Sequence, residues 1–389
     1  MSLSYLQLKV VEVIRETAEA VTIHFEHPDK INIPSKAGQY LTLIMPINGK
    51  EMRRSYSLSS APHEAPRLAV TVKKVPNGIV SNYLVEKCTV GMEMKVLEPM
   101  GNFKVETSPE KARNVVLVGA GSGITPLISI AKAILKEENK SRVTLIYGNR
   151  HEGTVIFREK LVEMQAQYNG RFVVEHVYSQ PKLDAPAGKK SVFKSLSSLF
   201  KKKEDNTPES DTNQHQYKGR LNRKMLIQIL ENLHLTNYSD LEFYLCGPAG
   251  MMEEAKEALQ ILQVSPDRIF KESFMSGKEK EPAPGTNVTT ADDIGDAADC
   301  HVVTIIFEGA EYKVPVQKGQ TILEAGLKQD IDLPYSCQAG LCTACRGKCL
   351  SGKVHLDEQD GLSDAEITNG YVLNCVSHPL TADVVIEIG

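Results

Sequence analysis

Residues 334–349 read PYSCQAGLCTACRGKC and place four cysteines within sixteen positions. The whole chain of 389 residues has eight cysteines, and five of them lie between residues 337 and 375. A secreted protein held together by disulfides is usually shorter and spreads its cysteines more evenly. The crowding therefore predicts a metal site, built from thiolates, near the carboxyl end of a much longer chain.

The spacing within this segment indicates which kind of metal site to expect. Three of the cysteines follow the pattern C-x4-C-x2-C, and a fourth lies farther along the chain. This is the ligand spacing of plant-type [2Fe–2S] clusters, in which one loop curls around two irons. Small residues between the cysteines permit that curl, and the loop's amides can point at the sulfurs. The predicted ligands are Cys337, Cys342, Cys345 and Cys375.

A structural zinc site is the alternative for these thiols. Zinc fingers favour paired C-x2-C knuckles, whereas this segment has one such pair inside a longer loop. The spacing therefore favours the iron–sulfur cluster. Cys349, the remaining thiol of the segment, is predicted to pack as a small apolar side chain.

The chain before the cysteines is predicted to form two further domains. Residues 1–108 contain many short strands punctuated by Gly and Pro, which is typical of a small antiparallel β-barrel. Strands and helices alternate over residues 109–276, which predicts a doubly wound α/β domain. Residues 301–389 read as strands around a short helix and predict a compact third domain.

Two segments interrupt this organisation. Residues 181–218 are rich in Lys, Ser, Pro, Asp and Asn, and we expect a mobile surface insertion there. Residues 277–300 are rich in Gly, Pro, Ala and Asp and predict a linker to the third domain.

Composition excludes several classes of function. The chain is 41% hydrophobic and 24% charged, which is ordinary for a globular protein, and its net charge of −4 predicts no general attraction to nucleic acid. The longest apolar stretch, residues 115–135, is interrupted by three glycines and a proline, so we expect no membrane span. The amino terminus lacks the features of a signal peptide. A cytoplasmic location is expected.

The segment RRSYSLSS, residues 53–60, contains the pattern Arg54-x-Tyr56-Ser57. Alone it could be an ordinary barrel strand with one exposed arginine. It resembles the flavin-binding signature of the ferredoxin–NADP reductase superfamily. The resemblance implies that Arg54 holds a flavin phosphate, that Tyr56 stacks on the isoalloxazine ring, and that Ser57 bonds near the ring's reactive nitrogen.

A second motif follows at the spacing seen in that superfamily. In VKKVPNGIVSNYL, residues 72–84, Gly78-x-x-Ser81 enters a predicted helix whose first amides could cradle a pyrophosphate. A pyrophosphate favours FAD as the flavin, although related reductases use FMN. The predicted flavin site consists of Arg54, Tyr56, Ser57, Leu58, Lys73, Gly78, Val80 and Ser81.

Two glycine-containing motifs predict a nicotinamide nucleotide site. VLVGAGSGITPLISI, residues 116–130, joins a strand to a helix, but Ile124 occupies the third glycine position of the usual fingerprint. YLCGPAGMM, residues 244–252, ends a parallel strand, where such sheets bind ligands. The superfamily also implies an acid and an aromatic near the flavin, at Glu272 and Phe274. The predicted nucleotide site consists of Gly119, Gly121, Gly123, Thr125, Pro126, Arg150, Cys246, Gly247 and Pro248.

The preference between NADPH and NADH depends on the 2′-phosphate. NAD-specific folds often have an acidic residue at the end of the second strand. This chain has Arg150 and Arg158 in that region, although Glu152 is there as well. The sequence therefore favours NADPH and leaves NADH open.

The last ninety residues resemble a plant-type ferredoxin, which implies a β-grasp fold. The order of flavin barrel, nicotinamide domain and ferredoxin is similar to that of reductases that serve multicomponent oxygenases. The resemblance implies electron transfer from NADPH through FAD and the cluster to a partner oxygenase, with Tyr56, Ser57 and Cys246 nearest the reaction. A di-iron epoxidase acting on phenylacetyl-CoA is the expected acceptor. An aromatic-ring dioxygenase, a general acceptor and a non-catalytic zinc scaffold remain alternatives.

Overall fold

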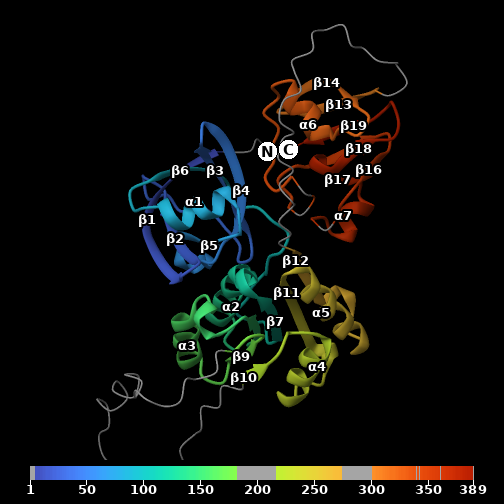
Figure 1. Ribbon diagram of the computed structural model, residues 1–389. Helices are drawn as coiled ribbons and strands as arrows, with labels where there is room; N and C mark the ends of the chain where they lie inside the picture. Colours follow the sequence, from blue (N-terminus) through green and yellow to red (C-terminus); the bar gives the residue numbers. More distant parts are fainter. Residues whose placement is uncertain are drawn as a thin grey trace, which may run out of the picture.

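The computed structural model describes residues 5–181, 216–273 and 300–388, except residues 339, 341 and 360. These residues form three main sheets, one for each predicted domain (Figure 1). The antiparallel, doubly wound and ferredoxin-type folds predicted from the sequence are confirmed. The described residues leave out most of the predicted insertion (181–218), the predicted linker (277–300) apart from residue 300, and Phe274.

The first sheet is antiparallel, with the strand order β4-β3-β6-β1-β2-β5. An isolated antiparallel bridge between Leu58 and Val70 joins the end of β4 to β5, which brings the two edge strands together. Alternating residues of the strands point inward and form an apolar core that includes Leu8, Ile23 and Leu43. The elements are β1 (Tyr5–Thr17), β2 (Ala20–Glu26), β3 (Tyr40–Ile47), β4 (Lys50–Ser57), β5 (Leu68–Lys73), α1 (Ile79–Lys87) and β6 (Glu93–Leu97).

The second sheet is parallel, with the order β10-β9-β8-β7-β11-β12. One apolar cluster joins the sheet to α2 and α3, and another joins it to α4 and α5, so the central strands are buried on both faces. This burial explains the nearly continuous apolar run of β7. The elements are β7 (Asn114–Ala120), α2 (Ile124–Glu137), β8 (Arg142–Asn149), α3 (Arg158–Gln167), β9 (Phe172–Tyr178), β10 (Gln216–Lys218), α4 (Arg223–Asn232), β11 (Leu241–Gly247), α5 (Ala249–Ile261) and β12 (Ile269–Ser273).

The third sheet is mixed, with the order β14-β13-β19-β15-β17, and a small pair of strands, β16 and β18, accompanies it. Helix α6 begins at a capping box in which the Thr321 hydroxyl accepts from the Glu324 amide at 3.1 Å. The elements are β13 (Cys300–Phe307), β14 (Ala310–Gln317), α6 (Ile322–Lys328), β15 (Arg346–Ser351), β16 (Val354–Leu356), α7 (Asp364–Thr368), β17 (Tyr371–Leu373), β18 (Ser377–Pro379) and β19 (Val385–Ile388).

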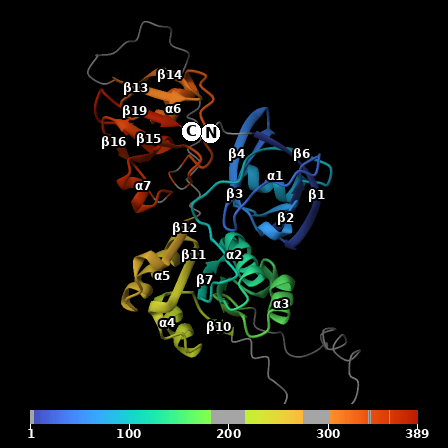
Figure 2. The same ribbon diagram turned by 180° about the vertical axis from the view of Figure 1, so that it is seen from behind.

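The barrel lies against both other domains (Figures 1 and 2). Its strand β4 faces the ferredoxin domain, and α2 of the nicotinamide domain lies below it in the view of Figure 1. Among the described residues, no helix is long and apolar enough to cross a membrane.

Candidate functional site

The flavin motif forms the end of β4, where it pairs with β3. Arg54 and Tyr56 are two residues apart and therefore lie on the same face of the strand, while Ser57 lies on the other. Ser57 is buried, and burial raises the pKa of the half-buried Tyr56. Arg54 is half-buried, and its Nη1 donates to the carbonyl of Arg53 at 2.8 Å. Leu58, next in the chain, is fully buried.

The second motif forms the start of α1. Gly78 is the N-cap residue, and the Ser81 hydroxyl accepts a hydrogen bond from the Val75 amide at 3.1 Å. A Cβ atom at Gly78 would lie 2.6 Å from the Ser81 oxygen, so only glycine leaves this turn unobstructed. Val80 is buried beneath it. The free amides of the first turn can hold a diphosphate, which fits FAD.

Lys73 leaves the barrel at the end of β5 and reaches the nicotinamide domain. Its Nζ lies 3.9 Å from the point where a Cβ on Gly121 would be. Burial lowers the pKa of Lys73, and the positive charge of Arg150 lowers it further. The lysine therefore belongs to the boundary between the two domains as well as to the barrel.

The glycines of the nucleotide motif permit close packing of the loop on the end of β11 and of α2 on β7. A Cβ at Gly123 would lie 2.1 Å from the carbonyl oxygen of Cys246, and one at Gly119 would lie 2.6 Å from Leu127 Cδ1. Gly121 has a φ of +56°, a conformation that favours glycine. The loop can therefore pack directly on the end of β11.

The remaining predicted nucleotide residues surround this contact. The Thr125 hydroxyl donates to the carbonyl of Ser122 at 3.0 Å, and Pro126 lies buried in the first turn of α2. Gly247 ends β11, and Pro248 is the N-cap residue of α5. These positions form the carboxyl-terminal edge of the parallel sheet, where doubly wound folds bind ligands.

Ser57, Glu272 and Cys246 meet where the barrel joins this edge. The Ser57 hydroxyl donates to Glu272 Oε2 at 3.0 Å, although the two residues belong to different domains. Cys246 is fully buried and pairs in register with Glu272 on β12 and with Gly119 on β7.

Withdrawal from water raises the pKa of Glu272 to about 8, although the Ser57 hydrogen bond opposes that shift. Burial and the neighbouring carboxylate raise the pKa of the Cys246 thiol. A carboxyl that titrates near neutrality at a domain junction is suited to hold or move a proton.

The four predicted metal ligands meet in the ferredoxin domain. Cys345 and Cys375 are buried, whereas Cys337 and Cys342 are half-buried. Contact with the Cys337 thiol raises the pKa of both Cys342 and Cys375, and Cys375 also contacts Cys345. No group of three His, Cys, Asp or Glu side chains in the described ranges surrounds a single ion position. The C-x4-C-x2-C spacing of Cys337, Cys342 and Cys345, with Cys375 from a separate segment, fits a [2Fe–2S] cluster.

A backbone turn and a side-chain hydrogen bond hold the cluster loop in place. Gly340 has a φ of +71°, and a Cβ there would lie 2.7 Å from Glu358 Cβ. The side-chain amide of Asn374 donates to the carbonyl of Cys345 at 3.0 Å, which ties the segment holding Cys375 to the loop. Cys349 is half-buried, and its thiol donates to the Ser351 carbonyl at 3.2 Å.

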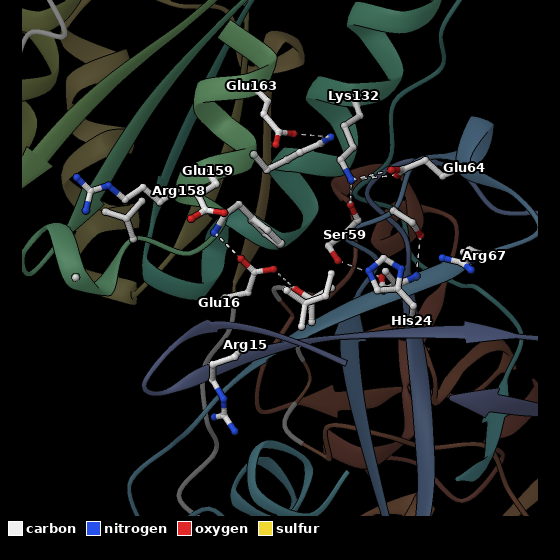
Figure 3. Close-up of a pocket in the computed structure, with 18 of the residues that line it drawn as sticks. Arg15, Glu16, His24, Ser59, Glu64, Arg67, Lys132, Arg158, Glu159 and Glu163 are labelled. Atoms are coloured by element: carbon white, nitrogen blue, oxygen red, sulfur yellow. Dashed lines mark hydrogen bonds and ion pairs between the residues drawn. The ribbon is translucent and has the colours of Figure 1, made fainter. Parts of the chain in front are cut away.

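The two arginines considered for the 2′-phosphate separate in the structure. Arg150 is exposed near Lys73, whereas Arg158 begins α3 and lines a cavity of about 620 Å³ between the barrel, α2 and α3 (Figure 3). None of the predicted flavin, nucleotide or metal residues lines this cavity. It is therefore separate from the candidate site.

A polar network around this cavity joins the two domains, and the sequence analysis did not identify it. Lys132 on α2 donates to the carbonyl of Ser59 at 3.0 Å and to both carboxylate oxygens of Glu64 at 3.1 Å (Figure 3). Glu16 on β1 accepts from the Phe157 amide at 3.1 Å. These contacts fix the barrel against the nicotinamide domain.

Comparison with known families agrees with this architecture. The chain matches an oxidoreductase FAD-binding domain over residues 6–105, a ferric reductase NAD binding domain over 112–260, and a 2Fe-2S iron-sulfur cluster binding domain over 305–380. It belongs to the ferredoxin–NADP reductase family, in the group that carries a C-terminal [2Fe–2S] ferredoxin domain. It is an NAD(P)H-dependent flavin oxidoreductase that uses FAD and a [2Fe–2S] cluster.

Individual relatives belong to several oxygenase systems. The chain is 32% identical to one of the subunits of the 1,2-phenylacetyl-CoA epoxidase of Escherichia coli K12, covering 99% of this chain and 98% of the relative. It is 33% identical to the ferredoxin reductase component of the 3-ketosteroid-9-alpha-monooxygenase of Mycobacterium tuberculosis, covering 96% and 93%. Phthalate dioxygenase reductase shares the fold, with a TM-score of 0.53, 21% identity, and 99% and 98% coverage. The chain is the reductase component of an oxygenase.

Proposed function

We propose that this chain delivers electrons from NADPH to a di-iron epoxidase that acts on phenylacetyl-CoA, as part of phenylacetate breakdown. The similarity to the epoxidase component over nearly the full length of both chains supports this choice. The 3-ketosteroid monooxygenase reductase is equally similar, so a reductase for that kind of oxygenase is the second candidate. The proposed domain limits are 1–108, 109–276 and 301–389, with a linker at 277–300.

The single observation that carries the electron-transfer function is the position of the barrel between two polar junctions. On one side Ser57 contacts Glu272 of the nicotinamide domain, and on the other Tyr40 contacts Thr343 beside the cluster ligand Cys342. When bound, FAD accepts a hydride from the nicotinamide and the [2Fe–2S] cluster passes its electrons on singly. The protein's role is to hold these groups in sequence and to keep water from the transfer.

The barrel residues that we assign to FAD act by binding and orientation. Arg54 and the amides at the start of α1 would neutralise the diphosphate, and Tyr56 would cover one face of the ring. Ser57 would donate near the ring, in competition with its bond to Glu272. The proposed set is Arg54, Tyr56, Ser57, Leu58, Lys73, Gly78, Val80 and Ser81, with Phe274 retained as a prediction outside the described residues.

The nicotinamide would occupy the edge formed by the glycine loop and the end of β11. Gly119, Gly123 and Cys246 form its tightly packed floor, and Glu272 can hold a proton there near neutral pH. The backbone groups of the loop would bind the nucleotide's phosphates, together with Thr125, Pro126, Gly247 and Pro248. Cys337, Cys342, Cys345 and Cys375 would bind the cluster.

Arg150 supports a preference for NADPH. It is exposed, and its charge adds to that of Lys73 beside the glycine loop. Replacing Arg150 by Glu should raise the KM for NADPH several-fold more than the KM for NADH. Equal effects on the two nucleotides would remove Arg150 from the phosphate site, and Arg158→Glu provides a matched control at the separate cavity.

The partner is tested by reconstitution. The purified reductase should support NADPH-dependent epoxidation of phenylacetyl-CoA when mixed with the oxygenase components of the epoxidase, and it should co-purify with them. If it instead supports a 3-ketosteroid monooxygenase and leaves the epoxidase inactive, the second candidate replaces the first.

A further inference from the structure

Helix α2 carries three polar side chains on one of its faces. Thr125, Ser129 and Lys132 follow one another at spacings of four and three residues, which places them on the same face of the helix. Thr125 belongs to the predicted nucleotide site and lies in the first turn. Ser129 lies one turn further along and is fully buried, and Lys132 follows after about one more turn.

Ser129 and Lys132 both bond to the barrel. The Ser129 hydroxyl donates to the carbonyl of Ser60 at 2.6 Å, and Lys132 Nζ donates to the carbonyl of Ser59 at 3.0 Å (Figure 3). A serine within a helix commonly bonds to a carbonyl of its own preceding turn. The Ser129 hydroxyl donates to the other domain instead. Two side chains of one helix therefore hold two consecutive carbonyls of the barrel.

Glu64 links Lys132 to the same short segment of the barrel. Its carboxylate accepts from Lys132 Nζ at 3.1 Å and from the Ala61 amide at 2.6 Å. The Lys132 side chain is only 16% exposed. Residues 59–61 thus present two carbonyls and one amide to a polar network that ends on α2.

This segment continues directly from the flavin motif. Ser57 is two residues before Ser59, and Leu58 between them is fully buried. The Leu58 amide donates to the carbonyl of Gln39 at 2.7 Å, so the backbone here is held on the barrel as well. Close-packed interiors transmit a displacement instead of absorbing it. A shift of the Ser59 and Ser60 carbonyls should therefore reach Ser57.

We propose that Ser129 and Lys132 are positioning residues that set the distance between the flavin site and the nucleotide site. The inference rests on the proposed function, in which the first turn of α2 holds the nucleotide and the end of β4 holds the flavin. About 10 Å of a single helix separates Thr125 from Lys132, so the two hydrogen bonds to the barrel fix one site relative to the other. A displacement of about 1 Å between reacting groups is enough to slow a transfer strongly.

A second contact across the same boundary provides a matched comparison. Glu16 Oε2 accepts from the Phe157 amide at 3.1 Å, which joins β1 to the start of α3. Neither residue belongs to α2 or to the segment that follows the flavin motif. This contact can stabilise the boundary, but it should not set the distance between the two sites.

Stopped-flow absorbance of the full-length, FAD-loaded protein tests the proposal. Ser129→Ala and Lys132→Met should each slow anaerobic bleaching of the flavin by saturating NADPH about tenfold or more. The charge-transfer absorbance that flavin and nicotinamide give when stacked should weaken as well. The NADPH concentration for half the maximal rate should change by less than about twofold, because the glycine loop is intact.

Two further variants separate positioning from general stability. Lys132→Arg keeps a donor for both Ser59 and Glu64, and the adjoining cavity of about 620 Å³ has room for the longer side chain. It should restore most of the rate that Lys132→Met loses. Glu16→Ala should lower the thermal stability but leave the bleaching rate within about twofold of the wild type.

Amide hydrogen exchange gives a readout that does not depend on catalysis. With FAD bound, the amides of residues 58–61 should exchange about fivefold faster in Ser129→Ala and Lys132→Met, because each variant loses a hydrogen bond to this segment. Their exchange in Glu16→Ala should equal that of the wild type. Unchanged exchange in Ser129→Ala and Lys132→Met would show that α2 does not hold the segment, and would overturn the proposal.

The kinetic results can overturn it too. Bleaching at the wild-type rate in either Ser129→Ala or Lys132→Met, or a change in NADPH affinity alone, would contradict a positioning role. An equal loss of rate in Glu16→Ala would show that the boundary matters only through its stability. A failure of the proposed function is distinguishable from these outcomes, because in that case NADPH would not bleach the flavin of the wild-type protein.

Discussion

The Ser57 hydroxyl of the flavin barrel donates a 3.0 Å hydrogen bond to Glu272 at the end of the nicotinamide domain. This bond crosses the boundary at which the flavin and nicotinamide rings are proposed to meet. Glu272 in turn lies beside the buried Cys246 on the adjacent strand. The contact therefore links the position of the barrel to the protonation of a carboxyl at the proposed reaction site.

Removing the Ser57 hydroxyl should impair hydride transfer. Ser57→Ala is expected to lower NADPH-dependent ferricyanide reduction about tenfold or more, because it removes a donor to the ring and frees Glu272 to move. Ser59→Ala is the control, since the Ser59 hydroxyl contacts Ala69 and Thr71 and not Glu272. Equal losses in both variants would indicate general damage to the barrel.

The raised pKa of Glu272 predicts a pH dependence of stability. The folded protein keeps this carboxyl protonated up to about pH 8, whereas the unfolded chain releases the proton near the ordinary value of 4.5. The folded state therefore binds more protons, and its stability should fall as pH rises from about 5 through 8. Thermal unfolding of the wild type should show this fall, and Glu272→Gln should reduce it. Identical pH profiles of stability for the wild type and Glu272→Gln would contradict the raised pKa of Glu272.

The packing of the nucleotide loop predicts a strong difference between two glycines. Gly123→Ala places a Cβ against the Cys246 carbonyl, so NADPH affinity and the stability of this domain should both decrease. Gly250→Ala is the matched control because no atom lies within 4 Å of its added Cβ, and it should gain about 0.5–1 kcal/mol from its position in α5. Calorimetry measures the change in stability, and nucleotide titration measures the change in NADPH affinity.

The Lys132 network should stabilise the junction between the barrel and the nicotinamide domain. Lys132→Ala leaves Glu64 and the Ser59 carbonyl without their shared donor and should cost about 1–3 kcal/mol in the free energy of unfolding. Lys160→Ala removes an exposed pair with Glu163 and should cost less than about 1 kcal/mol. If urea denaturation shows similar losses in the free energy of unfolding for Lys132→Ala and Lys160→Ala, the network does not stabilise the junction.

Local patterns made much of this molecule predictable. The cysteine spacing and the glycines at positions 78, 119, 121 and 123 mark short loops whose geometry depends on residues close together in sequence. The contact between Tyr40 and Thr343 spans 303 positions and leaves no such pattern. The pair Lys132–Glu64 was missed for the same reason, since an ordinary helix lysine and a loop glutamate carry no motif. Arg150 and Arg158, close in sequence, lie in different surroundings because the chain turns between them at Glu152–Thr154.

The central claim is that electrons enter through the barrel and leave through the four-cysteine cluster. Anaerobic NADPH addition to the wild-type protein, followed by visible absorbance and electron paramagnetic resonance, tests this most directly. The flavin bands should bleach and the signal of a reduced [2Fe–2S] cluster should appear. In Cys342→Ser the flavin should still bleach and ferricyanide should still be reduced, but the cluster signal and cytochrome c reduction should be lost, while Cys349→Ser behaves as wild type. A colourless wild-type protein that leaves NADPH unoxidised, or a Cys342→Ser variant that still reduces cytochrome c normally, would contradict the account.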